Sequence, residues 1–157
     1  MRKMLMGMAA AVAIVGATVT LPTAAVADGH VVTVKSALSV PATIDKLEAA
    51  LKSKGIGIMG RVDHAANAKK AGLELPPTLL LIFGNPKLGT PLMQSNRAIG
   101  MDLPMKALAW ADKDGAVYLS YTKPDALKSR YGISDKDPVF KKMTGALANF
   151  SKAATAK

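Results

Sequence analysis

Residues 105–122, MKALAWADKDGAVYLSYT, carry the clearest fold signal in the chain. Apolar and polar side chains alternate on both sides of the segment Asp112-Lys113-Asp114-Gly115. The Asp-Gly pair that ends this segment is typical of a tight turn between two antiparallel strands. The pattern therefore predicts a β-hairpin.

Three further strands are expected before the hairpin. Residues 30–37 are rich in Val and Thr and alternate in polarity, and residues 56–64 also have the composition of a strand. Residues 77–84, PTLLLIFG, form a continuous apolar run, which is typical of a strand that is buried on both faces.

Helices are expected between and after these strands. Ser39 can cap one helix that ends at Gly55, and the short stretch 65–75 predicts a helix that Gly72 stops. Asp137 can cap the last helix. The order of strand, helix, several strands and helix predicts an α+β fold, with an antiparallel sheet and helices on one face.

The N-terminus has the features of a cleavable secretory signal. Arg2 and Lys3 precede an apolar stretch, and Ala25-Val26-Ala27 has the small residues that signal peptidase recognises. The alternative is a membrane anchor, but the Gly- and Ala-rich stretch is weakly apolar for a span. We therefore expect a signal at residues 1–27, and a single domain at 28–157 that is periplasmic or secreted and not embedded in the membrane.

The composition limits the possible partners and chemistry. The chain contains 21 Lys and Arg against 11 Asp and Glu, and no Cys. Disulfides, thiolate metal sites and cysteine nucleophiles are therefore excluded. The positive surface attracts anions and anionic lipid headgroups, but its basic residues are mostly scattered lysines. No Arg-rich block or aromatic-interleaved basic run is present, so no nucleic-acid partner is expected.

Residues 82–91, IFGNPKLGTP, come close to the pattern of a phosphate-binding loop. That loop requires Lys directly after the second Gly, whereas Lys87 lies between Gly84 and Gly89. Pro86 also removes an N–H donor from the segment. We expect instead a stiff loop at the exit of a strand, in which Asn85 and Lys87 contact a ligand or form a plain turn.

His64 is the principal candidate for acid–base chemistry. A neighbouring carboxylate such as Asp63 can orient a His or raise its pKa, although consecutive strand residues point to opposite faces. A zinc site would have to recruit Asp63 or Asp102 beside His30, so no metal is expected. Tyr121 in the hairpin is a further candidate ligand contact. The motifs of serine hydrolases, zinc proteases and dinucleotide-binding proteins are absent, and no cofactor is expected.

Several of these residues fall in motifs of a known family. The stretches G-N-P-K-x-G-T, D-H-x-x-x-A, D-L-P and S-Y resemble the bacterial domain of unknown function 302, over about residues 31–153. The resemblance implies a TATA-binding-protein-like β-α-β(4)-α fold with a curved antiparallel sheet, and a homodimer. It implies no reaction. The positions that match the family motifs are Asp63, His64, Gly84, Asn85, Pro86, Gly89, Asp102, Leu103, Pro104 and Tyr121.

Three functions are compatible with the sequence. The first is a non-catalytic binding module for a small anionic or amphipathic ligand, contacted by residues such as His64, Asn85, Lys87 and Tyr121. The second is a homodimeric structural or assembly protein. The third is a hydrolase- or isomerase-type enzyme that uses His64 as the acid–base group.

Overall fold

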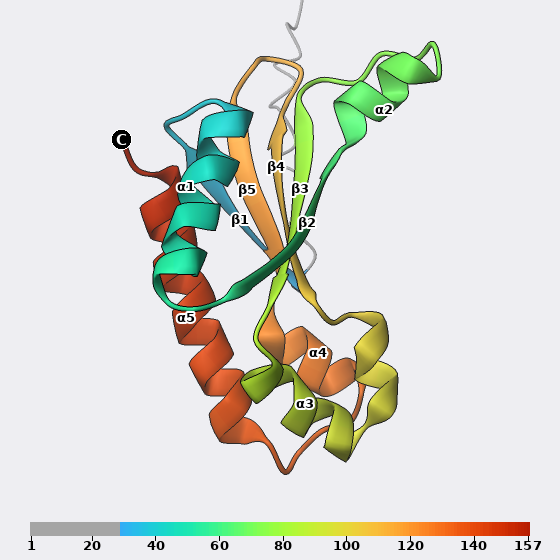
Figure 1. The fold of residues 1–157 in the computed structure, drawn as a ribbon, viewed down its shortest axis with the longest axis vertical. Coiled ribbons are helices and arrows are strands. Elements are labelled where there is room, and N and C mark those ends of the chain that lie inside the picture. The colour runs from blue at the N-terminus through green and yellow to red at the C-terminus, as the bar shows by residue number, and fades with distance from the viewer. Residues whose placement is uncertain (1–28) are drawn as a thin grey trace, which may run out of the picture.

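A five-stranded antiparallel sheet forms the centre of the fold (Figure 1). The computed structural model describes residues 29–157, so the expected secretory segment at 1–27 lies outside the described residues. The sheet has the order β1-β5-β4-β3-β2. Its strands are β1 (Val31–Ser36), β2 (Gly57–Asp63), β3 (Thr78–Gly84), β4 (Met105–Ala111) and β5 (Val117–Thr122).

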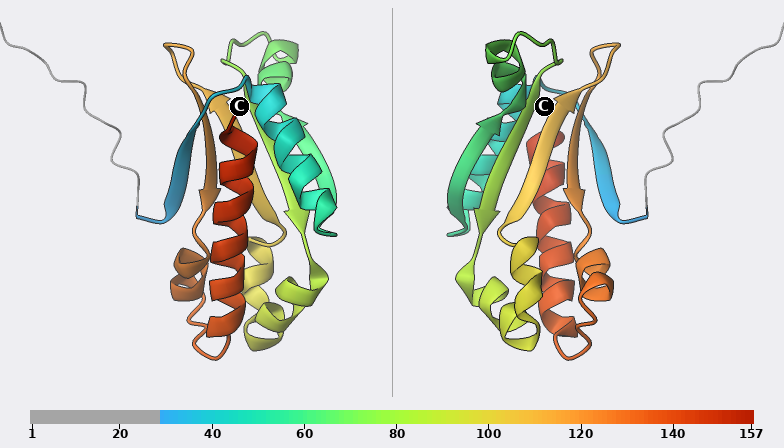
Figure 2. Two further views of the ribbon diagram at one scale, coloured as in Figure 1. Left: turned by 90° about the vertical axis from the view of Figure 1, so that its left-hand side faces the viewer. Right: turned by 90° about the vertical axis from the view of Figure 1, so that its right-hand side faces the viewer.

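Two long helices cover one face of this sheet. Figure 2 shows α1 and α5 side by side on that face. The helical segments are α1 (Val40–Ser53), α2 (His64–Lys70), α3 (Pro86–Ser95), the 3₁₀ helix η1 (Arg97–Met101), α4 (Pro124–Arg130) and α5 (Asp137–Thr155). The expected α+β class is confirmed. Without the short helical segments, the element order is the expected β-α-β(4)-α.

The core lies between the sheet and the two long helices. Ile44 of α1, Leu81 of β3, Leu119 of β5 and Phe140 of α5 are at most 1% exposed. Burial of apolar side chains of this size stabilises the fold by roughly 1.5–3 kcal/mol each. This layer fixes the relative positions of α1, α5 and the sheet that they cover.

The predicted hairpin is confirmed as β4 and β5. The carboxylate of Asp112 accepts hydrogen bonds from the backbone N–H groups of Asp114 and Ala116, at 3.0 and 2.8 Å. Gly115 has a φ of 82°, which a side chain would disfavour. The Asp-Gly signal therefore encodes this turn directly.

The predicted ends of α1 are also confirmed. The side chain of Ser39 accepts a hydrogen bond from the N–H of Ala42, and Gly55 follows the helix with a φ of 67°. The N–H of Ile56 then donates to the carbonyl of Leu51 at 3.1 Å, which completes a Schellman motif. Gly72 ends α2 in the same left-handed conformation, with a φ of 75°.

The prediction that Asp137 caps the last helix is wrong. Lys136 occupies the N-cap position and makes no side-chain cap hydrogen bond. Asp137 is the first residue of α5, and its carboxylate forms an ion pair of 2.7 Å with Lys128 of α4. A carboxylate in the first turn still favours the helix through its dipole.

The prediction that β3 is buried on both faces is also wrong. Leu81 and Phe83 are buried under the helices, whereas Leu80 and Ile82 on the other face are half-buried. Among residues 29–157 no helix lies over that second face of the sheet (Figure 2, right). The apolar run therefore supplies side chains to the core on one face of the sheet and to the uncovered face on the other.

The expected stiff loop after β3 is a helix. Asn85 is extended, and its side chain caps α3 by accepting a hydrogen bond of 2.9 Å from the N–H of Lys87. Pro86 takes the first helical position, where its missing N–H costs nothing. Asn-Pro therefore acts as a helix start, and the helix continues through Pro91. The sequence also did not reveal η1 or α4.

Candidate functional site

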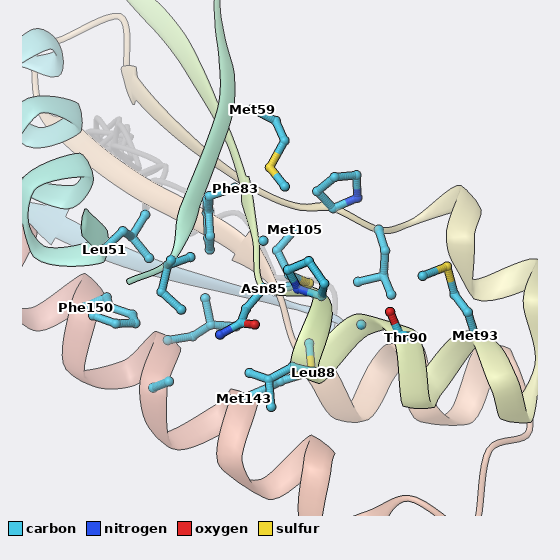
Figure 3. Close-up of a pocket in the computed structure, with 18 residues that line it drawn as sticks. Leu51, Met59, Phe83, Asn85, Leu88, Thr90, Met93, Met105, Met143 and Phe150 are labelled. Carbon is cyan, nitrogen blue, oxygen red and sulfur yellow. The ribbon is translucent and has the colours of Figure 1, made fainter. Parts of the chain in front are cut away.

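An apolar cavity of about 380 Å³ opens where β3 leaves the sheet. Side chains from every layer of the fold line it, including Leu51 of α1, Met59 of β2, Phe83 of β3, Met105 of β4 and Phe150 of α5 (Figure 3). The first turns of α3 close one side. The cavity is within the size range of small-molecule sites.

Short backbone segments on both sides of α3 and η1 shape this cavity. Gly84 lines it, and a Cβ there would approach the Cβ of Pro104 to 3.3 Å and the Cε of Met59 to 3.6 Å. A side chain at position 84 would therefore take up space at the cavity wall. Pro104, which follows a cis peptide bond after Leu103, lines the cavity directly beside Gly84.

The family-motif positions of this region meet at the cavity. They belong to two separate stretches of the sequence, G-N-P-K-x-G-T and D-L-P, and the structure brings these stretches together. The lining residues among them are Gly84, Asn85, Pro86, Gly89, Leu103 and Pro104. The signature of the sequence thus encodes the walls of one cavity.

Four methionines make the wall adaptable. Met59, Met93, Met105 and Met143 come from four different elements and all line the cavity. Met59 lies at the mouth and is 53% exposed. Thioether side chains have several rotatable bonds and adjust to ligands of different shape.

Few polar groups reach the cavity. Asn85 is half-buried, its Oδ1 caps α3, and its amide nitrogen has no hydrogen-bond partner within residues 29–157. Thr90 brings an exposed hydroxyl to the same side (Figure 3). The N–H groups of Leu88 and Gly89 donate to the carbonyl of Asn85, at 2.9 and 3.0 Å. These two N–H groups already donate hydrogen bonds within the helix, so they are not free to bind a phosphate group.

The other predicted contact residues lie outside the cavity. His64 is the exposed first residue of α2, and the carboxylate of Asp63 caps that helix by accepting a hydrogen bond of 2.8 Å from the N–H of Ala66. Lys87 is exposed at the start of α3. Tyr121 is 7% exposed and packs in the core beneath the helices. The structure therefore brings neither His64 nor Tyr121 to Asn85.

Asp102 joins a separate polar cluster. Its Oδ2 accepts hydrogen bonds from the hydroxyl of Tyr131 at 2.6 Å and from the guanidinium of Arg130 at 2.7 Å. The Tyr131 hydroxyl, and next the Arg130 guanidinium, hold the pKa of Asp102 below its usual value, although partial burial opposes them. The same hydrogen bond raises the pKa of Tyr131. The cluster fastens the end of η1 to the end of α4, and no spacing in the sequence revealed it.

Residues 29–157 contain no group of three or more His, Cys, Asp or Glu side chains placed to hold a metal ion. None of the helices within the same residues has the length and apolar character needed to cross a membrane.

Fold and cavity together define a small α+β domain with an apolar ligand-sized cavity, built around one strand exit and its capped helix. Residues 32–150 match the sequence profile of the family described as Domain of unknown function DUF302. The chain belongs to this family, and the expected membership is confirmed.

A solved structure shows the same fold. It is the crystal structure of an uncharacterized conserved protein DUF302 from Bacillus stearothermophilus, with a TM-score of 0.65 and 22% sequence identity. The match covers 82% of this chain and 97% of that chain.

Curated relatives are more similar in sequence. Proteins named Fluoride-specific ion channel FluC 1 from Brucella suis and from Brucella abortus are each 46% identical to this chain over 134 residues. These matches cover 85% of this chain but 53% and 50% of the two relatives. The chain thus spans about half the length of the curated relatives it matches.

Proposed function

We propose that this domain is a non-catalytic binding module that holds a small amphipathic ligand in the cavity beside α3. The observation that carries the proposal is the cavity itself, because its wall is almost entirely apolar and open to solvent at Met59. Apolar concave sites with a few placed polar groups are the usual form of a small-molecule site. The amide nitrogen of Asn85 supplies such a group.

The geometry favours binding over catalysis. An acid–base mechanism needs a titratable group within hydrogen-bond reach of the substrate. In the described part of the chain, residues 29–157, no Asp, Glu, His or Lys lines the cavity, and His64 is exposed on α2. We further propose that the domain acts after export, on the basis of the secretory pattern at residues 1–27.

The ligand can be sought directly. The protein is purified from its own host without detergent, extracted with organic solvent, and the extract is analysed by mass spectrometry. In parallel, thermal unfolding is followed with fatty acids, haem and simple anions. A ligand at about 100 times its Kd stabilises the folded state by roughly 2.7 kcal/mol. If the extract is empty and no compound raises the Tm, the binding module must be abandoned.

A second candidate function is assembly as a homodimer through the uncovered face of the sheet. Leu80, Ile82 and Leu108 are half-buried on this face, and Trp110 stacks on Tyr118 with ring centroids 4.9 Å apart. An apolar surface of this kind suits association with a second copy. Sedimentation of the wild type and of Leu108→Lys tests it, and a monomeric wild type at high concentration would rule out this assembly.

A further inference from the structure

We propose that the ligand is a single-chain amphiphile with an anionic head, whose tail fills the cavity while lysines at its rim hold the head. This inference rests on the proposed binding function and adds the charge and orientation of the ligand. Its basis is the distribution of charged side chains around an apolar cavity, together with the polar donors of α3.

Three lysines lie close in sequence to residues that line the cavity. Lys54 lies between Leu51 and Ile56, at the C-cap of α1. Lys142 precedes Ala146 by one turn of α5, so both lie on the same side of that helix. Lys87 stands next to Pro86 at the start of α3. We call Lys54, Lys87 and Lys142 the rim lysines.

The rim lysines are exposed and form no ion pair with a carboxylate of residues 29–157. Lysines elsewhere show the contrast: Lys52, Lys113 and Lys128 each lie within 3 Å of a carboxylate oxygen. The charge of the rim lysines is therefore available to a ligand.

Within residues 29–157, no negatively charged side chain belongs to the cavity wall. No Asp or Glu lines it, and the nearest one in sequence, Asp102, is bound by Arg130 and Tyr131. A cationic head would meet only like charges at the rim, whereas an anionic head finds ammonium groups there. The amide of Asn85 and the hydroxyl of Thr90 add hydrogen-bond donors for its oxygen atoms.

The test compares probes that share one tail and differ in the head. Laurate, lauryl phosphate, lauryl alcohol and lauryl trimethylammonium are titrated below their micelle concentrations and followed by calorimetry and native mass spectrometry. The rim variant carries Lys54→Gln, Lys87→Gln and Lys142→Gln. The matched control carries Lys35→Gln, Lys70→Gln and Lys123→Gln, which remove the same charge from residues that do not line or flank the cavity.

We expect laurate or lauryl phosphate to bind more tightly than the alcohol, and the cation to bind most weakly. An exposed charge pair contributes about 0.2–1 kcal/mol, so the rim variant, which removes three lysine charges, should lose roughly 3- to 140-fold in affinity for the anions. It should leave the alcohol unchanged, and the control variant should bind the anions within about twofold of the wild type. The affinity for the anions should also fall as salt is raised.

Two negative outcomes are distinguishable. If all four probes bind equally well, or the rim variant binds the anions as the wild type does, the inference is overturned while the binding module stands. If none of the four probes binds, the amphiphile-binding function and the inference fail together. Circular dichroism of both variants establishes that they fold, which we expect because all six lysines are exposed or lie at the surface.

Discussion

Replacing Ala146 by Leu tests whether the cavity is open space in the folded protein. Ala146 is a half-buried residue of α5, and its side chain lines the cavity. The substitution adds three carbon atoms at this wall. If the space is empty, the new side chain enters it without displacing its neighbours.

The magnitude follows from burial. Each added carbon contributes about 0.8 kcal/mol when it is removed from water, which sets an upper limit near 2.4 kcal/mol. Since Ala146 is half-buried, part of the leucine stays at the mouth, and we expect Ala146→Leu to raise the free energy of unfolding by about 1 kcal/mol. The added side chain takes up part of the cavity of about 380 Å³, so it should also weaken the binding of laurate.

Urea unfolding at equilibrium provides the measurement, with stability taken from the midpoint at an unchanged m value. Ala148→Leu is the matched control, because Ala148 lies on the same helix and is exposed. Ala and Leu have similar helix propensities, so the control should change stability by less than about 0.5 kcal/mol. It should bind laurate as the wild type does.

The opposite sign would refute the reasoning. Overpacking of a filled core costs about 1–3 kcal/mol, so a destabilised Ala146→Leu would mean that no space exists there. An unchanged stability together with unchanged laurate binding would place the side chain in solvent. Either result removes the basis for the proposed binding module.

Three further predictions concern the residues around the sheet. Asp63→Ala should cost about 1 kcal/mol of stability in urea unfolding, because the cap of α2 is lost, whereas His64→Ala should change it by less than about 0.5 kcal/mol. Asp102 stabilises the folded state because its pKa is lower there than in the unfolded chain. This stabilisation is fully present above the pKa of the unfolded chain, near 3.9, and is lost as the pH falls through the pKa of the folded protein. Tyr131→Phe removes the hydrogen bond that lowers the pKa of Asp102 most. Urea unfolding should therefore show that this variant loses less stability than the wild type across the same acidic pH interval. Leu81→Ala, at a side chain with no exposure, should destabilise by about 2–5 kcal/mol in the same assay.

Local signals in the sequence predicted much of the fold. Three of these signals depend on interactions within a few residues, and all three occur as expected. They are the Asp-Gly turn of the hairpin, the Ser39 cap of α1, and Gly55 directly after the end of α1. The continuous apolar run of β3 misled because an exposed but apolar sheet face has the same pattern as a strand covered on both sides. Burial on the second face depends on what packs there, which a local pattern does not contain.

The candidate site was only partly predictable. Asn85 lies in a segment whose Pro and Gly residues stand out in the sequence, and the structure places it at the cavity. The cavity itself needs Leu51, Phe83 and Phe150 from three distant parts of the chain, and their apolar character signals only a core. His64 was favoured because of its chemistry, but its position on α2 follows from the cap made by Asp63.

The pairing of β1 has a consequence for the order in which the protein assembles. β2, β3, β4 and β5 each pair with a strand that is adjacent in the sequence, whereas β1 pairs only with β5, so that Val34 faces Leu119. Bringing distant segments together costs more loop-closure entropy and slows folding. A chain that emerges from a pore with its N-terminus first would therefore expose β1 before its only partner arrives. We expect the four-stranded meander to form early, and the first strand of the chain to be the last to join the sheet.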